Sequence, residues 1–164
     1  MAKRLPVALR ALVYMTGFLL FFAWLALRVR ALDRFLQITL PERVDIVGIV
    51  MMVGGGVLAL ACVGTFIIRG KGTPAPFDAP REFVATGPYR YARNPMYVGG
   101  LSLLAGFGLC EHSVSILLMA LALFLAVHLL VVFYEEPTLR KLFGSTYHDY
   151  CRTTARWIPT LTRR

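Results

Sequence analysis

The chain has 164 residues, enough for one compact unit, but 57% of them are apolar, 16% are charged and the mean hydropathy is +0.64, unlike an ordinary soluble domain. The net charge is +9, yet no nucleic-acid-binding motif accompanies it, so we expect no nucleic-acid partner. The three cysteines lie far apart without a CxxC pair or a paired histidine, so the sequence supports neither a disulfide framework nor a zinc site, and we expect no metal.

Four apolar runs follow one another along the chain, at residues 11–27, 46–68, 94–110 and 113–134. A helix needs about 20 residues to cross the hydrocarbon core, with about 17 as the lower limit. The second and fourth runs are long enough, whereas the first and third are marginal. A soluble helical bundle would need polar helix faces that these runs lack. We therefore predict an all-α, polytopic membrane protein with about four transmembrane helices.

The positive charges indicate how these helices are oriented. Lys3 and Arg4 precede the first run as in a secretory signal, but the run is long and no small-x-small cleavage site follows, so we expect a retained helix. With four crossings, the N-terminal tail, the middle loop and the C-terminus carry three, five and six Lys or Arg residues, against four on the other side. The positive-inside rule then places both termini and the middle loop in the cytoplasm, where they would also attract anionic membrane lipids.

The chain is expected to form a single membrane domain, residues 1–164, with two transmembrane helices in residues 1–68. Residues 69–164 would supply a cytoplasmic loop, a helical hairpin and a C-terminal segment. Residues 69–76 are rich in Gly and Pro and predict a linker. Glu111, His112 and Ser113 predict a tight turn, so the third and fourth runs should form an antiparallel hairpin.

The segment after the fourth run has a different pattern. Pro137 fits the start of a new helix. Apolar and aromatic residues then recur at helical spacing between charged ones: Leu139, Leu142, Phe143, Tyr147 and Tyr150. This pattern predicts an amphipathic helix on the membrane surface, which either only lies there or also covers a site.

Two polar elements lie at the edges of the apolar runs, a Tyr- and Pro-rich stretch at residues 87–99 and the pair Glu135-Glu136. Such groups are costly in lipid unless they face water or protein. The tyrosines are either interfacial anchors or a recognition site for an organic cation, and the carboxylates either pair with arginines or hold an amino group. Both elements fall on the predicted cytoplasmic side, which favours a site for a cationic, zwitterionic ligand.

His128 is the titratable group within the fourth run and lies seven residues before Glu135. In a regular helix this spacing places the two side chains on one face, two turns apart. Its ring is expected either to bond a backbone carbonyl of a neighbouring helix or to face the same site.

These two elements resemble a known family. The pattern Gly87-Pro88-Tyr89-x-x-x-Arg93-Asn94-Pro95-x-Tyr97-x-Gly99 is similar to the signature of isoprenylcysteine carboxyl methyltransferases, whose broader relatives include phospholipid methyltransferases. The same family's C-terminal block resembles Glu135-Glu136-x-x-Leu139-x-x-x-Phe143-Gly144-x-x-Tyr147-x-x-Tyr150, followed by Arg156 and Ile158-Pro159. The resemblance covers about residues 70–160 and leaves the first two helices matched only in hydrophobicity.

The resemblance implies an integral membrane enzyme that uses S-adenosyl-L-methionine, bound in a cytoplasmic pocket under the C-terminal segment, to methylate a lipophilic or lipidated acceptor. The cofactor-binding residues that it implies are Tyr89, Asn94, Pro95, Met96, Tyr97 and Glu135, and residues 81–84 align with a further cofactor-lining stretch. Arg93, Glu136 and Arg156 are the catalytic candidates, although Arg93 and Glu136 are also expected as structural supports. A carboxylate acceptor would need a cation such as Arg93, Arg152 or Arg156, and an amine acceptor would need a base such as Glu136 or His148.

Asn94 stands where the named signature has His. An amide can hydrogen-bond but does not titrate near neutral pH, so a proton-transfer role at this position is absent. The acceptor stays open among a prenylcysteine-type carboxylate, a lipid amine and a thiol. The alternatives to a methyltransferase are a non-catalytic scaffold of the same fold and an NADPH-dependent reductase of the sterol-reductase type, for which no extra basic cluster is evident.

Overall fold

The structure is a computed structural model that describes residues 7–38, 40–41, 43–70 and 83–159. Its elements, in chain order, are α1 (Val7–Arg30), α2 (Asp33–Leu36), α3 (Val44–Thr65), η1 (Phe66–Gly70), η2 (Gly87–Arg90), α4 (Pro95–Cys110), α5 (Val114–Leu130), η3 (Val131–Glu135) and α6 (Glu136–Thr153). Within these residues there is no strand, only an isolated bridge between Ala92 and Ala155. The predicted all-α class is confirmed.

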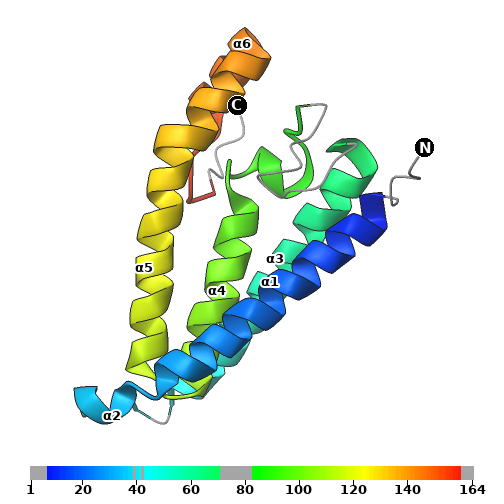
Figure 1. Cartoon of the computed structure of the whole chain (residues 1–164). Coiled ribbons are helices and arrows are strands. Elements are labelled where there is room, and N and C mark those ends of the chain that lie inside the picture. The colour runs from blue at the N-terminus through cyan, green and yellow to red at the C-terminus, as the bar shows by residue number, and fades with distance from the viewer. Residues whose placement is uncertain (1–6, 39, 42, 71–82, 160–164) are drawn as a thin grey trace, which may run out of the picture.

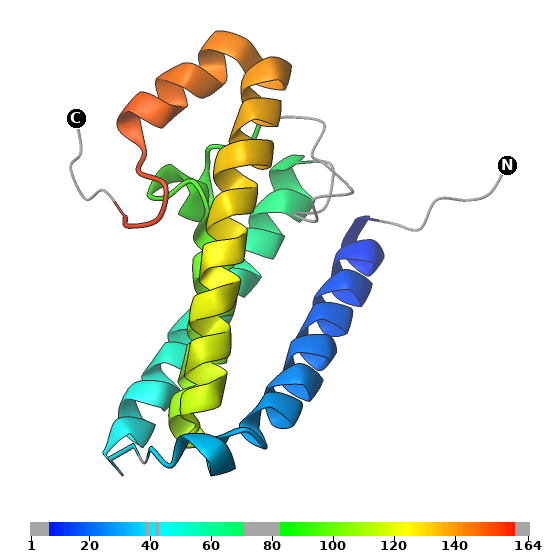
Figure 2. The same cartoon turned by 60° about the vertical axis from the view of Figure 1, so that its left-hand side comes forward.

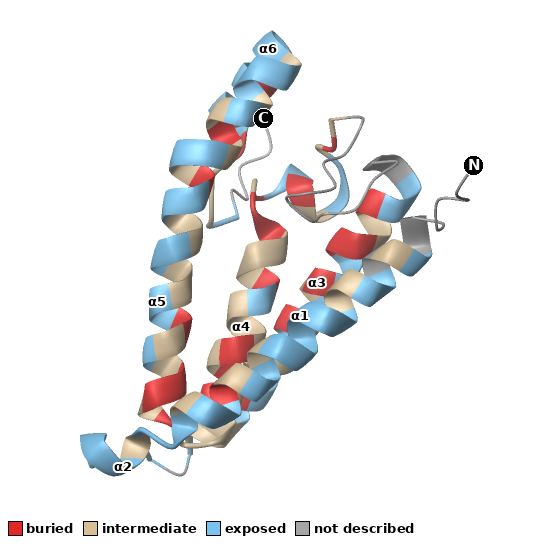
Figure 3. Ribbon diagram, in the orientation of Figure 1, coloured by how far each residue is buried: buried red, intermediate tan, exposed pale blue. Residues whose placement is uncertain are grey.

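The long helices α1, α3, α4 and α5 form a membrane-type bundle (Figures 1 and 2). In the part of the chain that the structure describes, three segments are long and apolar enough to cross a bilayer: Leu12–Leu36, Val44–Ile68 and Val114–Thr153. The helix α4 is apolar but has only 16 residues, about 24 Å at 1.5 Å per residue, which is less than the thickness of a hydrocarbon core. Exposed residues lie along α1 and α5 (Figure 3), and many of them have large apolar side chains, as expected where lipid rather than water covers a helix.

Small residues allow α3 and α4 to pack almost backbone to backbone. A Cβ atom built on Gly55 would lie 2.6 Å from the carbonyl oxygen of Gly99, and one built on Gly106 would lie 2.6 Å from that of Gly48. Ser102, Gly106 and Cys110 recur every four residues along α4, and all three lie against glycines of α3. This spacing of small residues is visible in the sequence, but the helix that it contacts is not.

This contact predicts that Gly55→Ala lowers the free energy of unfolding by about 1–3 kcal/mol, because backbone atoms of α4 must move to admit the methyl group. The neighbouring Gly54 is a matched control, since a Cβ there has nothing within 4 Å. Gly54→Ala should leave stability unchanged or raise it slightly, because alanine favours a helix. Denaturant unfolding of the two variants in the same detergent compares them, and equal midpoints would contradict the packing argument.

The bundle end that contains α2 is held by polar contacts around the turn between α4 and α5. The Asp33 carboxylate accepts a hydrogen bond from the backbone N–H of Ser115 at 2.8 Å, and Arg30 forms an ion pair with Glu111. The Ser113 hydroxyl caps α5 by accepting from the N–H of Ile116 at 3.1 Å. The predicted tight turn and antiparallel hairpin are thus present, and α1 is tied to them.

The other bundle end gathers the beginning of α1, the end of α3, η2 and α6 (Figure 1). The helix α6 follows α5 directly through the π-helical turn η3 and bends at Gly144, where φ is +52°. It is amphipathic as predicted, with Tyr147 buried and Arg140 exposed. The first of the two cavities described below lies at this end.

Candidate functional site

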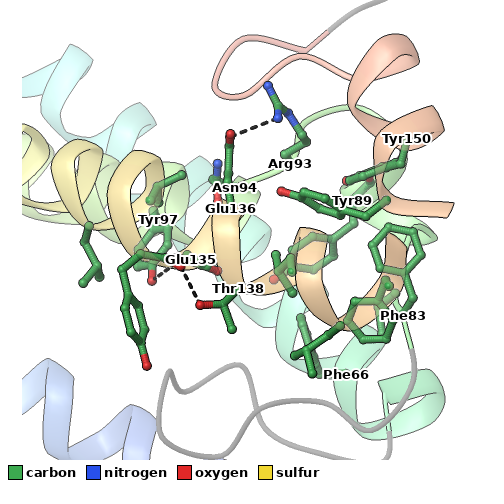
Figure 4. A pocket seen from close by; sticks show the side chains of 18 residues that line it. Phe66, Phe83, Tyr89, Arg93, Asn94, Tyr97, Glu135, Glu136, Thr138 and Tyr150 are labelled. Carbon is green, nitrogen blue, oxygen red and sulfur yellow. Dashed lines mark hydrogen bonds and ion pairs between the residues drawn. The ribbon is translucent and has the colours of Figure 1, made fainter. Parts of the chain in front are cut away.

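A cavity of about 220 Å³ lies between η2, the start of α4, the end of α5 and the inner face of α6 (Figure 4). Aromatic side chains form a large part of its wall and come from η1, η2, α4, η3, α6 and the segment before η2: Phe66, Phe83, Tyr89, Tyr97, Tyr134, Phe143, Tyr147 and Tyr150. Arg93, Asn94, Glu135 and Glu136 supply most of the polar part of the wall. The cavity therefore combines π faces with a small number of charged groups.

The loop that carries Tyr89 has a strict requirement for glycine at its start. Gly87 has a φ of +61°, and a Cβ there would lie 2.6 Å from the Thr65 hydroxyl oxygen. The chain then turns so that the Tyr89 ring packs edge-on against Phe66, with 5.1 Å between ring centroids. The Tyr150 hydroxyl donates a hydrogen bond to the Tyr89 carbonyl. Burial raises the pKa of Tyr89 well above its usual value, so the phenol stays neutral.

The two adjacent carboxylates face different partners because of η3. In this turn the N–H of Glu136 bonds the carbonyl of Val131, five residues earlier, instead of four. The wider turn contains one extra residue. In a regular helix Glu135 would lie on the same face as His128, but with the extra residue Glu136 takes that position. Glu135 faces α4, where it accepts a hydrogen bond from the Tyr97 hydroxyl at 3.2 Å.

Glu136 is the centre of an ion-pair cluster, and its side chain is only 3% exposed. Its Oε1 accepts from Arg93 Nη1 at 2.9 Å and from Arg156 Nε at 2.7 Å, and its Oε2 accepts from Arg156 Nη2 at 3.0 Å and from Arg140 at 3.3 Å. The hydrogen bonds to Glu136 raise the pKa of Arg156, so the guanidinium remains charged. The three predicted catalytic residues are therefore brought together, but they bind one another.

The segment at residues 154–157, here called the C-terminal strap, crosses the loop before α4. Its Ala155 carbonyl accepts from the backbone N–H of Arg93 at 2.9 Å. Its Arg156 carbonyl accepts from the Asn94 side-chain amide at 3.2 Å. Asn94, which stands where the resembled signature has His, is buried; its amide fastens the strap and also lines the cavity.

The other predicted site residues are distributed unevenly. Tyr89, Asn94, Tyr97 and Glu135 all line the cavity. Pro95 begins α4 and does not line the cavity, and Met96 packs against the apolar cluster that includes Tyr89 and lines a second cavity described below. Of the aligned residues 81–84, Phe83 and Val84 line the cavity, while 81 and 82 lie outside the described residues. Sequence reasoning did not identify Phe66, which follows α3 directly and shows no signal beyond its aromatic type.

A second cavity, of about 520 Å³, lies between α1, α4 and α5 within the apolar part of the bundle. Its wall is almost entirely apolar and includes Phe18 and Phe22 of α1 and Phe107 of α4. Tyr97 and Leu130 line both cavities. We call this space the apolar groove and the first cavity the polar cavity; the two share a wall at Tyr97 and Leu130.

Fold and site together define an integral membrane protein in which a polar, aromatic cavity adjoins an apolar one. The model of the phospholipid methyltransferase family matches residues 44–146, more than half of the chain, and the chain belongs to that family. The resemblance predicted from the two sequence blocks is thus confirmed in its broader form, while the isoprenylcysteine type stays a prediction.

Curated relatives match shorter stretches. The chain is 34% identical over 73 residues to phosphatidylethanolamine N-methyltransferases of Sordaria macrospora and Neurospora crassa, a match that covers 44% of this chain and 8% of each fungal protein. It is 30% identical over 80 residues to the nickel-cobalt-cadmium resistance protein NccN of Alcaligenes xylosoxydans xylosoxydans, covering 49% of this chain and 37% of that relative. The chain thus spans only a part of each relative's length.

Proposed function

We propose that this protein is an S-adenosyl-L-methionine-dependent methyltransferase that methylates the amine of a membrane lipid at the cytoplasmic face. The observation that carries the proposal is the shared wall of the two cavities, where Tyr97 and Leu130 border both the polar cavity and the apolar groove. Family membership supports the reaction class. The excess of Lys and Arg at the site end of the bundle supports the cytoplasmic placement.

The residues of the polar cavity suit the cofactor. When bound, S-adenosyl-L-methionine supplies a methyl group that is already activated by its positive sulfur. Tyr89 and the other aromatic rings offer π faces to that cation, a contact worth roughly 0.5–2 kcal/mol per ring. Glu135 offers a carboxylate to the amino group, and Asn94 offers an amide. Displacement at an activated methyl group mainly requires orientation and exclusion of water, which an aromatic cavity under α6 provides.

The pairing of the arginines favours an amine over a carboxylate as the acceptor. Of the three cations expected to hold a carboxylate, Arg93 and Arg156 are both engaged by Glu136, and Arg152 is exposed and does not line the cavity. Glu135 has a tyrosine rather than an arginine as its hydrogen-bond partner, so the wall where the cavities meet attracts positive charge. Glu136 is a poor candidate for a base because three arginines hold it, and His148 is exposed on α6 and does not line the cavity. The lipid ammonium has to lose a proton before its nitrogen can accept the methyl group, and Glu135 is the carboxylate of the cavity wall left to accept that proton.

The apolar groove suits the lipid's chains. Its wall consists of membrane-embedded helices, so an acyl chain can occupy it while the headgroup reaches Tyr97. This arrangement accounts for a methyltransferase built into the membrane: the acceptor arrives from the bilayer and the polar cofactor from the aqueous side.

The proposal predicts which lipid acquires label. Purified protein is reconstituted with methyl-labelled S-adenosyl-L-methionine into vesicles of phosphatidylcholine that contain either phosphatidylethanolamine or a farnesylcysteine lipid with a free carboxylate. We expect label in N-methylated phosphatidylethanolamine and none above background in vesicles of phosphatidylcholine alone. Label in the farnesylcysteine ester would contradict the amine assignment. If neither lipid acquires label and the protein does not bind the cofactor, the enzyme assignment is wrong.

A further inference from the structure

We infer that His128, inside the bundle, is a positioning residue that anchors the C-terminal strap through Trp157 and thereby holds the polar cavity in its binding geometry. The inference rests on the proposed function for the effect on cofactor binding, but not for the anchoring itself. His128 does not line the cavity, so any influence on the site has to pass through the strap.

The anchor is an aromatic cluster with one directed hydrogen bond. Trp157 Nε1 donates to His128 Nδ1 at 3.1 Å, and the Phe124 ring packs edge-on against Trp157 with 5.3 Å between centroids. An indole N–H can only donate, so Nδ1 has to be the unprotonated nitrogen and the neutral ring carries its hydrogen on Nε2. The expected bond to a backbone carbonyl is thus replaced by a bond from a side chain 29 residues further along the chain.

Consecutive strap residues bind three separate parts of the site. Ala155 accepts from the backbone of Arg93, Arg156 binds Glu136 and Asn94, and Trp157 binds His128. The π-helical turn η3 matters here because it places Glu136 above His128 on one helix face. His128 of α5 therefore binds Trp157, and Glu136, at the start of α6, binds the neighbouring Arg156.

The anchor differs physically from the rest of the strap's contacts. The Arg156 side chain is 31% exposed, so water competes for its hydrogen bonds and weakens them. The Trp157 ring packs its apolar surface against α5, and water does not weaken such an apolar contact. Loss of the anchor should leave the strap held by polar contacts alone, and Arg93 and Asn94 should then lose their fixed positions beside the cavity.

The chain offers a direct probe of this anchor, since it has two tryptophans, Trp24 and Trp157. In a Trp24→Phe background the fluorescence reports on Trp157 alone. We expect His128→Leu to shift this emission to longer wavelength, to increase quenching by acrylamide and to weaken S-adenosyl-L-methionine binding about five- to tenfold, as for one lost hydrogen bond. His128→Asn keeps an acceptor near the Nδ1 position and should restore the parent values. Leu129→Ala, at the exposed neighbouring residue, is the matched control and should change none of them.

A second readout needs no cofactor. Arg93 Nη1 also donates to the Cys151 thiol at 3.0 Å, so a loosened Arg93 should uncover Cys151. We expect maleimide to label Cys151, followed by peptide mass spectrometry, several-fold faster in His128→Leu and in Trp157→Phe than in the parent. Cys110, at the other end of the bundle, provides an internal control within each sample.

The outcomes separate this inference from the proposed function. Unchanged Trp157 emission and unchanged Cys151 labelling in His128→Leu would overturn the anchor. A changed emission with unchanged Cys151 labelling would overturn the positioning role. A parent protein that binds no S-adenosyl-L-methionine would overturn the proposed function, while faster Cys151 labelling in the variants would still support the positioning of Arg93 by His128.

Discussion

Replacing Glu136 with glutamine should lower the free energy of unfolding by about 3–5 kcal/mol, because it leaves the largely buried Arg93 guanidinium without its counter-charge. The carboxylate is 3% exposed and Arg93 is 13% exposed, so water cannot take over its role. Glutamine has nearly the same shape, which makes charge the main difference. Cofactor binding should fall as well, since Arg93 and Arg156 fix the loop and the strap beside the cavity. Denaturant unfolding monitored by circular dichroism, together with equilibrium binding of labelled cofactor, measures both effects.

Arg140→Gln is the control for this cluster. Arg140 also pairs with Glu136, but it is 54% exposed, and an exposed ion pair typically contributes under about 1 kcal/mol. Its replacement should leave unfolding and binding close to the parent. A Glu136→Gln protein as stable as Arg140→Gln would show that the cluster does not hold the site together.

Replacing Glu135 with glutamine should weaken cofactor binding strongly but, unlike Glu136→Gln, should hardly change stability. We expect binding of S-adenosyl-L-methionine to weaken about 10- to 100-fold, because a charge-assisted hydrogen bond becomes a neutral one. Stability should change by under about 1 kcal/mol, since Glu135 forms no ion pair within the described residues and its hydrogen-bond partner is the neutral Tyr97. Methyl transfer at a subsaturating cofactor concentration should fall in parallel with the binding.

Tyr97→Phe separates the carboxylate's charge from its orientation. This variant keeps the ring that both cavities share and removes only the hydroxyl that donates to Glu135. We expect cofactor binding to weaken no more than about fivefold. If Glu135→Gln binds the cofactor as tightly as the parent does, the assignment of Glu135 to the cofactor's amino group is wrong.

The different effects on stability expected for the two adjacent glutamates could not be predicted from the sequence. The sequence identifies both as a polar pair at a membrane edge, but several arginines were possible partners for either. Which glutamate binds the arginines depends on the π-helical turn η3. The sequence of residues 131–134 contains no signal that predicts an extra residue in that turn. The catalytic roles of Arg93, Glu136 and Arg156 stay predictions, and the pairing of both arginines with Glu136 could be seen only from the folded positions of three segments.

The amino-acid sequence by itself determined the membrane class, the helical hairpin, the amphipathic last helix and the family. Each of these depends on local features: the length of apolar runs, turn residues and two short motifs. The tertiary structure decided the rest. It set α3 as the partner of α4's small residues, joined the polar cavity to the apolar groove at Tyr97, and brought Trp157 to His128. These contacts join residues far apart in the chain, and in an apolar helix many faces are equally able to pack, so only the folded arrangement selects among them.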